Sequence, residues 1–215
     1  MTPVICLVTD RRRHPGGSEA ALIERVAAAA RAGVHLIQIR ERDLDARALT
    51  RVAAAAVAAA RGTSARILVN DRTDVALAAG AHGVHLRGDS VAATRVREIV
   101  PPGFLVGRSV HSREEAERVA EAGGLDYLMF GTVFDTASKP GVTGSGPDTL
   151  AAIVGATPLP VLAIGGMSVS RMGVVAKAGA AGFAGIGLFG DSPLDRLQVV
   201  VRQASLAFDT LPRVP

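Results

Sequence analysis

The sequence is poor in several residue types, and each shortage excludes a class of protein. Cysteine occurs once, at Cys6, so an internal disulfide and any site built on paired cysteines are excluded. Aromatic residues make up 3% of the 215 residues and tryptophan is absent, which argues against binding of single-stranded nucleic acid by base stacking. No apolar run is long enough to cross a membrane, and no signal peptide is recognisable. We expect a cytoplasmic protein without nucleic-acid or membrane partners, in which Cys6 is a small buried hydrophobe.

Positive charge is in moderate excess, with a formal net charge of +4. The lysines and arginines are dispersed, apart from one cluster formed by Arg11, Arg12, Arg13 and His14. Two interpretations of this cluster remain open. It is either a solvated loop or a basic rim that attracts an anionic substrate.

What the sequence has in abundance is short apolar runs, most of them separated by alanine-rich stretches of helical length. There are eight such runs, and nearly all end in glycine or polar residues: 4–10, 34–40, 67–71, 83–86, 105–111, 127–132, 160–166 and 182–187. Continuous β-branched runs are typical of parallel strands that are buried on both faces. The alternation predicts an α/β protein, in which residues 1–215 form a single-domain (β/α)8 TIM barrel. Its active site is expected at the carboxyl ends of the strands.

Several of these predicted strand ends carry residues that suit anion or metal binding. Gln38 and Arg40 alternate at the end of the second strand and would share one face. Arginine at such a position can hold a phosphate by two parallel hydrogen bonds, although a surface ion pair between Arg40 and Glu41 is the alternative. Asn70 and Asp71 end the third strand. They suit coordination of Mg2+, and they suit capping of the next helix equally well.

The later strand ends carry further polar residues. His85 and Asp89 follow the fourth strand, and Ser109 and His111 the fifth. A lone histidine such as His85 is more often packed and hydrogen-bonded than catalytic. Residues 135–147 read as a long active-site loop, in which Thr136, Ser138 and Lys139 could bind an anion. The alternative for Lys139 is a solvated loop lysine.

Two glycine clusters follow the last two strands, at 165–166 and 185–190. Phosphate sites in barrels of this kind are often built by these two loops, because glycine lets backbone N–H groups approach phosphate oxygens. The alternative is that both loops need glycine only to make tight turns.

In this order the motifs resemble the thiamin phosphate synthase / thiazole tautomerase-like superfamily, over almost the whole chain. The matching segments are VTD, QIRER, VNDR, GVHL, VGRSVHSREEA, DYLMFGTVFDTASKPG, PVLAIGG and AGFAGIG. The resemblance implies a transferase of thiamin biosynthesis. Such an enzyme joins hydroxymethylpyrimidine diphosphate to a thiazole phosphate and releases diphosphate, with Mg2+ as cofactor.

The resemblance also implies residue roles. Arg40, Ser109 and Lys139 would be catalytic, and Asp71 and Asp89 are the candidates for holding Mg2+. Substrate binding would fall to Gln38, Arg40, Asn70, Thr136, Ser138, Lys139, Gly166 and Gly187. Among these, Gln38 would contact the pyrimidine, Thr136 and Ser138 would lie near the thiazole, and the two glycines would hold its phosphate.

Three positions depart from the synthase or tautomerase patterns. Arg42 replaces the usual lysine of the second strand's motif. Ser90 stands where a second Mg2+ carboxylate belongs, and Asp89 lies one place early. Thr132 occupies the position of the tautomerase histidine, and threonine is a poor acid or base near neutral pH.

These departures keep two further functions in view. The chain could be a tautomerase-like isomerase of a thiazole carboxylate phosphate, which the SKPG loop favours and Thr132 opposes. It could also be a non-catalytic paralogue that binds a phosphorylated ligand. Each of these hypotheses is compatible with association into a homo-oligomer.

Overall fold

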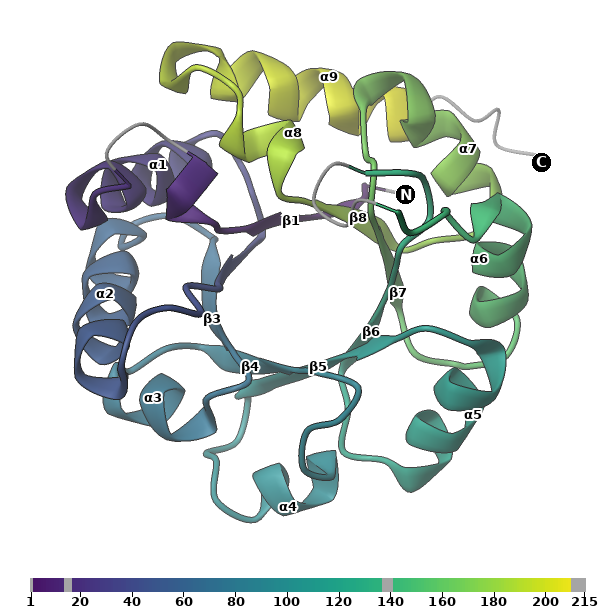
Figure 1. The fold of residues 1–215 in the computed structure, drawn as a ribbon, viewed down its shortest axis with the longest axis horizontal. Coiled ribbons are helices and arrows are strands. Elements are labelled where there is room, and N and C mark those ends of the chain that lie inside the picture. The colour runs from purple at the N-terminus through teal and green to yellow at the C-terminus, as the bar shows by residue number, and fades with distance from the viewer. Residues whose placement is uncertain (1, 14–16, 137–140, 210–215) are drawn as a thin grey trace.

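The computed structural model describes residues 2–13, 17–136 and 141–209, and its centre is a closed barrel of eight parallel strands (Figure 1). Each strand pairs with its neighbours in the sequence, and the last strand pairs with the first. The strands are β1 Val4–Val8, β2 Leu36–Ile39, β3 Arg66–Asn70, β4 Gly83–Leu86, β5 Leu105–Val110, β6 Tyr127–Phe130, β7 Val161–Ile164 and β8 Gly182–Gly185. The predicted (β/α)8 barrel is confirmed.

Helices follow the strands and form the outer ring of the molecule (Figure 1). The α-helices are α1 Glu19–Arg31, α2 Ala46–Ala59, α3 Thr73–Ala78, α4 Ala93–Arg97, α5 Arg113–Ala122, α6 Gly146–Val154, α7 Met172–Lys177, α8 Gly187–Gly190 and α9 Leu197–Asp209. Short 3-10 helices are η1 Arg11–Arg13, η2 Val169–Arg171 and η3 Leu194–Arg196. Within the described ranges, no helix is long and apolar enough to span a membrane.

Side-chain oxygens cap three of the longer helices. The hydroxyl of Ser18 accepts a hydrogen bond at the start of α1, the carboxylate of Asp45 does so for α2, and the hydroxyl of Ser112 for α5. Such caps satisfy backbone N–H groups that have no partner inside the helix. They therefore fix the residue at which each helix begins.

The apolar side chains form two layers, as the alternation along each strand requires. The larger layer lies between the strands and the helices. The smaller fills the barrel lumen, and its buried members are Cys6, Val8, Leu36, Leu68, Tyr127, Met129, Leu162 and Ala184. Burial raises the pKa of the Cys6 thiol to about 12, so this residue behaves as the small buried hydrophobe expected from the sequence.

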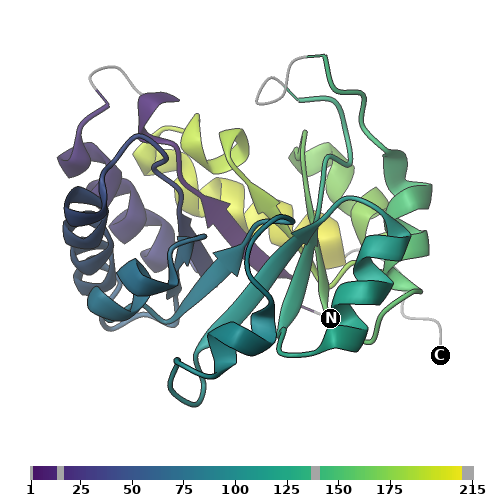
Figure 2. The same cartoon turned by 60° about the horizontal axis from the view of Figure 1, so that its bottom comes forward.

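Polar loops gather at one end of this packed lumen. Figure 2 shows η1, which follows β1, and the chain between β6 and α6 on the same side of the barrel. Both segments follow the carboxyl ends of their strands. This is the end at which enzymes of this fold place their active sites.

The barrel closes where Gly182 of β8 pairs with Val4 of β1. A Cβ atom on Gly182 would overlap with the backbone carbonyl oxygen and nitrogen of Val4. Both groups are main-chain atoms of a neighbouring strand, so neither can rotate aside. Glycine is therefore required here for close approach of the first and last strands.

We predict that Gly182→Ala lowers the free energy of unfolding by about 2 kcal/mol, because the added methyl group must push β1 and β8 apart. Gly173→Ala in α7 is the matched control, since its new Cβ would lie 3.7 Å from the Ala207 carbonyl oxygen, an ordinary contact distance. Helix propensity favours alanine over glycine there by roughly 0.5–1 kcal/mol. Urea unfolding followed by circular dichroism measures both. Equal stabilities of the two variants would contradict the assignment.

Candidate active site

A cavity of about 780 Å³ opens at the carboxyl end of the barrel. Most of its polar side chains come from strand ends and from the loops that follow them. They include Gln38, Arg40, Arg42, Asn70, His85, Asp89, Ser109, His111, Thr132 and Thr136. The sequence-predicted candidates at the ends of β2 to β5 thus meet around one cavity, apart from Asp71, which faces an adjoining one.

The ends of β2 and β3 are joined by a side-chain hydrogen bond. The amide nitrogen Nε2 of Gln38 donates to Oδ1 of Asn70 at 3.0 Å. Gln38 is buried, and Ile39 packs in the outer layer instead, as the alternation along β2 predicts. The bond fixes the orientation of both amides. The side-chain oxygen of Gln38 and the side-chain nitrogen of Asn70 therefore have defined orientations at the cavity wall.

Arg40 brings positive charge to the same wall. Burial is the main influence on this guanidinium and lowers its pKa, with Arg42 adding to the effect. Arginine nevertheless stays protonated in proteins. A poorly hydrated positive charge beside a cavity favours an anionic ligand, because less solvation must be lost on binding.

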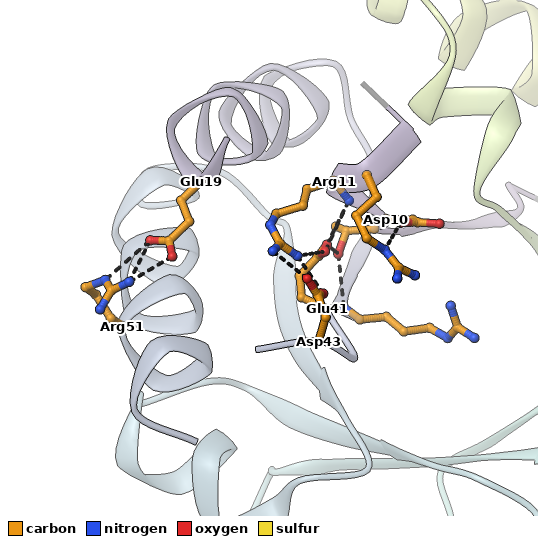
Figure 3. Close-up of polar contacts among 9 residues, drawn as sticks. Asp10, Arg11, Glu19, Glu41, Asp43 and Arg51 are labelled. Atoms are coloured by element: carbon orange, nitrogen blue, oxygen red, sulfur yellow. Dashed lines mark hydrogen bonds and ion pairs between the residues drawn. The ribbon is translucent and has the colours of Figure 1, made fainter. Parts of the chain in front are cut away.

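Glu41 stabilises the segment after β2 that carries Arg40. Its carboxylate is buried and accepts hydrogen bonds from the Thr9 hydroxyl at 2.6 Å and from the backbone N–H of Arg11 at 3.1 Å (Figure 3). The Thr9 hydroxyl in turn accepts a hydrogen bond from the backbone N–H of Arg40 at 3.0 Å. The ion-pair partner of Glu41 is Arg11 rather than Arg40, so the surface pair considered from the sequence does not form.

The arginine cluster after β1 is largely neutralised by acidic partners. Besides Glu41, the guanidinium of Arg11 pairs with Asp43 at 2.6 Å (Figure 3). Arg13 lines the cavity and pairs with Asp191, which follows α8, through two hydrogen bonds. These ion pairs therefore connect the segment after β1 to the segments after β2 and after α8. His14 lies outside the described residues.

Asp71 lies just beyond β3 in a left-handed backbone conformation, with φ of 62°. Its carboxylate accepts a hydrogen bond from the Ser90 hydroxyl, and Nη1 of Arg87 lies 3.6 Å from its second oxygen. Helix α3 has Arg72 at its N-cap position and no side-chain capping hydrogen bond. Asp71 is thus directed toward the loop after β4, and the helix-cap alternative is not realised.

Asp89 borders the cavity and shares Arg87 with Asp71. Its carboxylate pairs with Nη2 of Arg87 at 2.7 Å, and 70% of its side chain is exposed. Across the described ranges, no group of three or more histidine, cysteine or acidic residues is arranged to hold a metal ion. The Asp71 carboxylate and the Ser90 hydroxyl, which contact one another, are one pair of oxygens that suits a hard cation.

The loop that carries Ser90 is held by a buried arginine that the sequence analysis did not single out. Arg108 of β5 points outward and donates to the backbone carbonyl of Ser90 at 2.9 Å and to that of Val91. It also donates to the carbonyl of Gly88 at 3.3 Å. These bonds place the Ser90 hydroxyl opposite Asp71.

His85 lies at the floor of the cavity between two hydroxyl groups. Its Nδ1 is 2.9 Å from the Tyr127 hydroxyl, and its Nε2 is 2.9 Å from the Ser109 hydroxyl. Burial lowers the pKa of His85 to about 3, with the charges of Arg108 and Arg40 adding to the effect. The imidazole is neutral at physiological pH and fits the packed, hydrogen-bonded histidine expected from the sequence. Tyr127 was missed, because a tyrosine in a buried strand carries no sequence signal of its partner.

The two glycine loops border the cavity at Gly166 and Gly187. Gly166 has φ of 61°, and a Cβ there would lie 2.5 Å from the Asp135 carbonyl oxygen. A Cβ on Gly187 would lie 2.8 Å from Oδ2 of Asp191. Gly166 therefore requires glycine, whereas the side chain of Asp191 could move away from a Cβ on Gly187, and both glycines border the cavity.

The loop after β6 is described only in part. Thr136 borders the cavity. Ser138 and Lys139, which were predicted to bind substrate, lie outside the described residues. Their roles stay predictions.

Fold and cavity together define a (β/α)8-barrel protein whose polar cavity lies at the carboxyl ends of its strands. A family model described as thiamine monophosphate synthase matches residues 5–189. The chain belongs to the thiamine monophosphate synthase family.

Individual relatives agree with this assignment. The thiamine-phosphate synthase of Roseiflexus sp. (strain RS-1) is 40% identical over 185 residues, covering 84% of this chain and 75% of that protein. The thiamine-phosphate synthase of Chlorobium luteolum is 36% identical and covers 85% of this chain and 83% of its own. The solved structure of thiamine phosphate pyrophosphorylase from Pyrococcus furiosus is 30% identical, with a TM-score of 0.81 over 95% of this chain and 96% of that one.

We predict that Glu41→Ala lowers the free energy of unfolding by about 2 kcal/mol, because it leaves the Thr9 hydroxyl hydrogen and the backbone N–H of Arg11 without their acceptor. Asp43→Ala is the matched control, since it removes the more exposed of the two carboxylates on Arg11. An exposed pair contributes about 1 kcal/mol or less. Chemical unfolding measures both variants. A larger loss for Asp43→Ala than for Glu41→Ala would show that the buried cluster does not hold this loop.

Proposed function

We propose that this protein is a thiamine-phosphate synthase that couples hydroxymethylpyrimidine diphosphate to thiazole phosphate. The observation that carries the proposal is the meeting of Gln38, Arg40, Asn70 and Ser109 at one cavity, in a chain whose relatives bear that name. The cavity is large enough for two small rings, since ligand sites typically measure about 300–1,000 Å³.

In the proposed reaction, the bond between the pyrimidine methylene carbon and the diphosphate oxygen breaks, and the electron pair leaves with diphosphate. The thiazole nitrogen then donates its lone pair to the methylene carbon. No strong base is needed, so catalysis rests on holding the two rings together and stabilising the separated charges. We assign Arg40, Asn70 and Lys139 to the diphosphate and Gln38 to the pyrimidine.

The remaining assignments concern the thiazole side. Thr136 and Ser138 would lie beside the thiazole, and the backbone at Gly166 and Gly187 would hold its phosphate. Thr136 and both glycines border the same cavity as Arg40, which supports this division of the site into two halves.

Mg2+ is part of the proposal, and two oxygen donors near the cavity fit it. The Ser90 hydroxyl contacts the carboxylate of Asp71, so two hard oxygen donors face one another. Mg2+ usually takes one or two carboxylates and completes its shell with substrate phosphate and water. Bound there, it would neutralise charge on the diphosphate. Asp89 would join only after leaving Arg87.

A thiazole tautomerase-like activity is the second candidate, and one contact favours it. The side chain of His111 lines the cavity, and its Nδ1 lies 2.6 Å from the carbonyl oxygen of Gly131. This places an imidazole next to Thr132, where the tautomerase pattern carries its histidine. A cytoplasmic location, a homo-oligomer and the absence of a nucleic-acid partner stay predictions.

The test is a coupling assay with purified protein, hydroxymethylpyrimidine diphosphate and thiazole phosphate, with and without Mg2+. We expect Mg2+-dependent formation of thiamin phosphate. Asp71→Asn should lower this turnover at least about 100-fold, because it removes the carboxylate while asparagine tolerates the left-handed backbone. Asp74→Asn is the matched control, since Asp74 pairs with Arg72 on the surface and borders neither cavity.

Absence of product with retained binding of thiazole phosphate would refute the synthase proposal. It would favour the tautomerase, or a binding paralogue if isomerisation of the thiazole carboxylate phosphate is also absent. Equal turnover of Asp71→Asn and Asp74→Asn would remove Asp71 from the metal site.

We further predict that Ser90→Asp raises the affinity for Mg2+ about tenfold, because it places a second carboxylate opposite Asp71. Titration calorimetry with Mg2+ and inorganic pyrophosphate measures the change. Ser112→Asp, at the N-cap of α5, adds the same charge away from Asp71 and serves as the control. Unchanged Mg2+ affinity in Ser90→Asp would contradict the geometry proposed for these two residues.

A further inference from the structure

Three polar side chains cross the floor of the cavity in a line. Tyr127 comes from β6, His85 from β4 and Ser109 from β5, and consecutive members are 2.9 Å apart. The lumen beneath them is apolar, with Cys6 and Leu68 among its buried members. The order of the three residues is therefore hydroxyl, imidazole, hydroxyl, with the first end deep in the barrel and the last at the cavity.

A glycine makes room for this arrangement. Gly107 precedes Ser109 by two residues on β5 and shares its face, and a Cβ on Gly107 would overlap with the Tyr127 ring. The tyrosine ring thus occupies space that a side chain of β5 would otherwise fill. His85 and Tyr127 are both buried, so the line has one exit, at Ser109.

The direction of the hydrogen bonds follows from counting hydrogens at the buried end. The Tyr127 hydroxyl carries one hydrogen, and burial raises its pKa well above the ordinary value, so it keeps that hydrogen. In the described part of the chain, the hydrogen-bond partner of this hydroxyl is Nδ1 of His85. If Nδ1 carried a hydrogen itself, the tyrosine hydrogen would face apolar side chains, and an unsatisfied buried donor is costly. Tyr127 therefore donates, and Nδ1 accepts.

The second bond then has only one possible direction. A neutral imidazole carries a single hydrogen, so Nδ1 as acceptor leaves the hydrogen on Nε2. Nε2 of His85 consequently donates to the Ser109 hydroxyl oxygen. The hydrogen of Ser109 cannot point back at His85 and is directed toward the cavity that this residue lines.

We propose that Tyr127 and His85 act as positioning residues that make Ser109 a hydrogen-bond donor to the substrate. The ligand atom that Ser109 recognises must then be an acceptor, either a phosphate oxygen or an unprotonated ring nitrogen. A donor fixed before the reaction can stabilise negative charge without reorganisation. The inference deepens the proposed synthase function, although the direction of the bonds in the free protein does not depend on it.

The hydrogen positions can be measured by two-bond 1H–15N correlation NMR on protein labelled with 15N-histidine, at pH 8.5, well above the ordinary pKa of imidazole. Three other histidines are internal references. Nδ1 of His35 and of His82 accepts from a backbone N–H, so both must carry their hydrogen on Nε2. Nδ1 of His111 faces a carbonyl oxygen and must carry the hydrogen itself.

We expect the His85 signals, assigned by their loss in His85→Gln, to match the pattern of His35 and His82. A pattern matching that of His111 would overturn the proposal. Tyr127→Phe removes only the hydroxyl and should give His85 a mixture of the two forms. Cys6→Ala, a change in the same lumen that spares the three residues, should leave the His85 pattern unchanged.

The nature of the acceptor is tested by binding to the whole protein in the presence of Mg2+. Inorganic pyrophosphate and hydroxymethylpyrimidine are titrated separately into the unaltered chain and into Ser109→Ala. We expect about fivefold weaker binding of one of them, as for one lost neutral hydrogen bond. Weaker pyrophosphate binding identifies a phosphate oxygen, and weaker pyrimidine binding a ring nitrogen. Unchanged affinity for both would overturn the proposed donor role.

The two proposals can fail separately. The NMR measurement needs no substrate, so it reports on the three residues whether or not the coupling assay gives product. If His85 carries its hydrogen on Nε2 and no thiamin phosphate forms, only the synthase proposal fails. In an active enzyme, Tyr127→Phe should lower kcat/KM by about three- to tenfold, the effect of a single weakened hydrogen bond.

Discussion

The structure depends on one constraint, which is that a closed parallel barrel turns alternate residues of every strand into a lumen filled by packed side chains. Apolar residues satisfy this constraint at the bottom and middle of the lumen. Toward the carboxyl ends the inward positions become polar, and each buried polar group then needs a partner. Gln38 finds Asn70 on the next strand, and His85 finds hydroxyls on β5 and β6. The site is therefore built from pairs that the barrel's curvature brings together.

The charged side chains around the cavity need partners for the same reason. Arginines behind the cavity are bound to carboxylates or carbonyls, as Arg11 is to Glu41 and Arg108 is to the loop after β4. Because Glu41 is committed to Arg11 and Thr9, it does not neutralise Arg40 in an ion pair. The acidic residue beside Arg40 in the sequence thus helps to place this cation at the cavity without pairing with it, which leaves the charge available to an anion.

The alternation of apolar runs and helical stretches was enough to predict the barrel, because each strand's burial and length are local properties of the chain. It also predicted that the ends of β2 to β5 would meet, since parallel strands share one carboxyl edge. Contacts between distant side chains were not predictable in this way. Tyr127 and Arg108 read as ordinary strand residues, and only the folded chain shows that one reaches His85 and the other the Ser90 loop.

The Asp71 region shows why motif spacing alone could not settle the metal site. A shift of one residue separates Asp89 from the position that Ser90 occupies, and in a loop such a shift changes which side chain faces inward. Here the Ser90 hydroxyl contacts the Asp71 carboxylate, and the carboxylate of Asp89 is paired with Arg87. With one protein carboxylate, a divalent cation would depend on the substrate's own phosphates for most of its ligands. Metal and diphosphate would then bind as a unit, so affinity for either alone would be low.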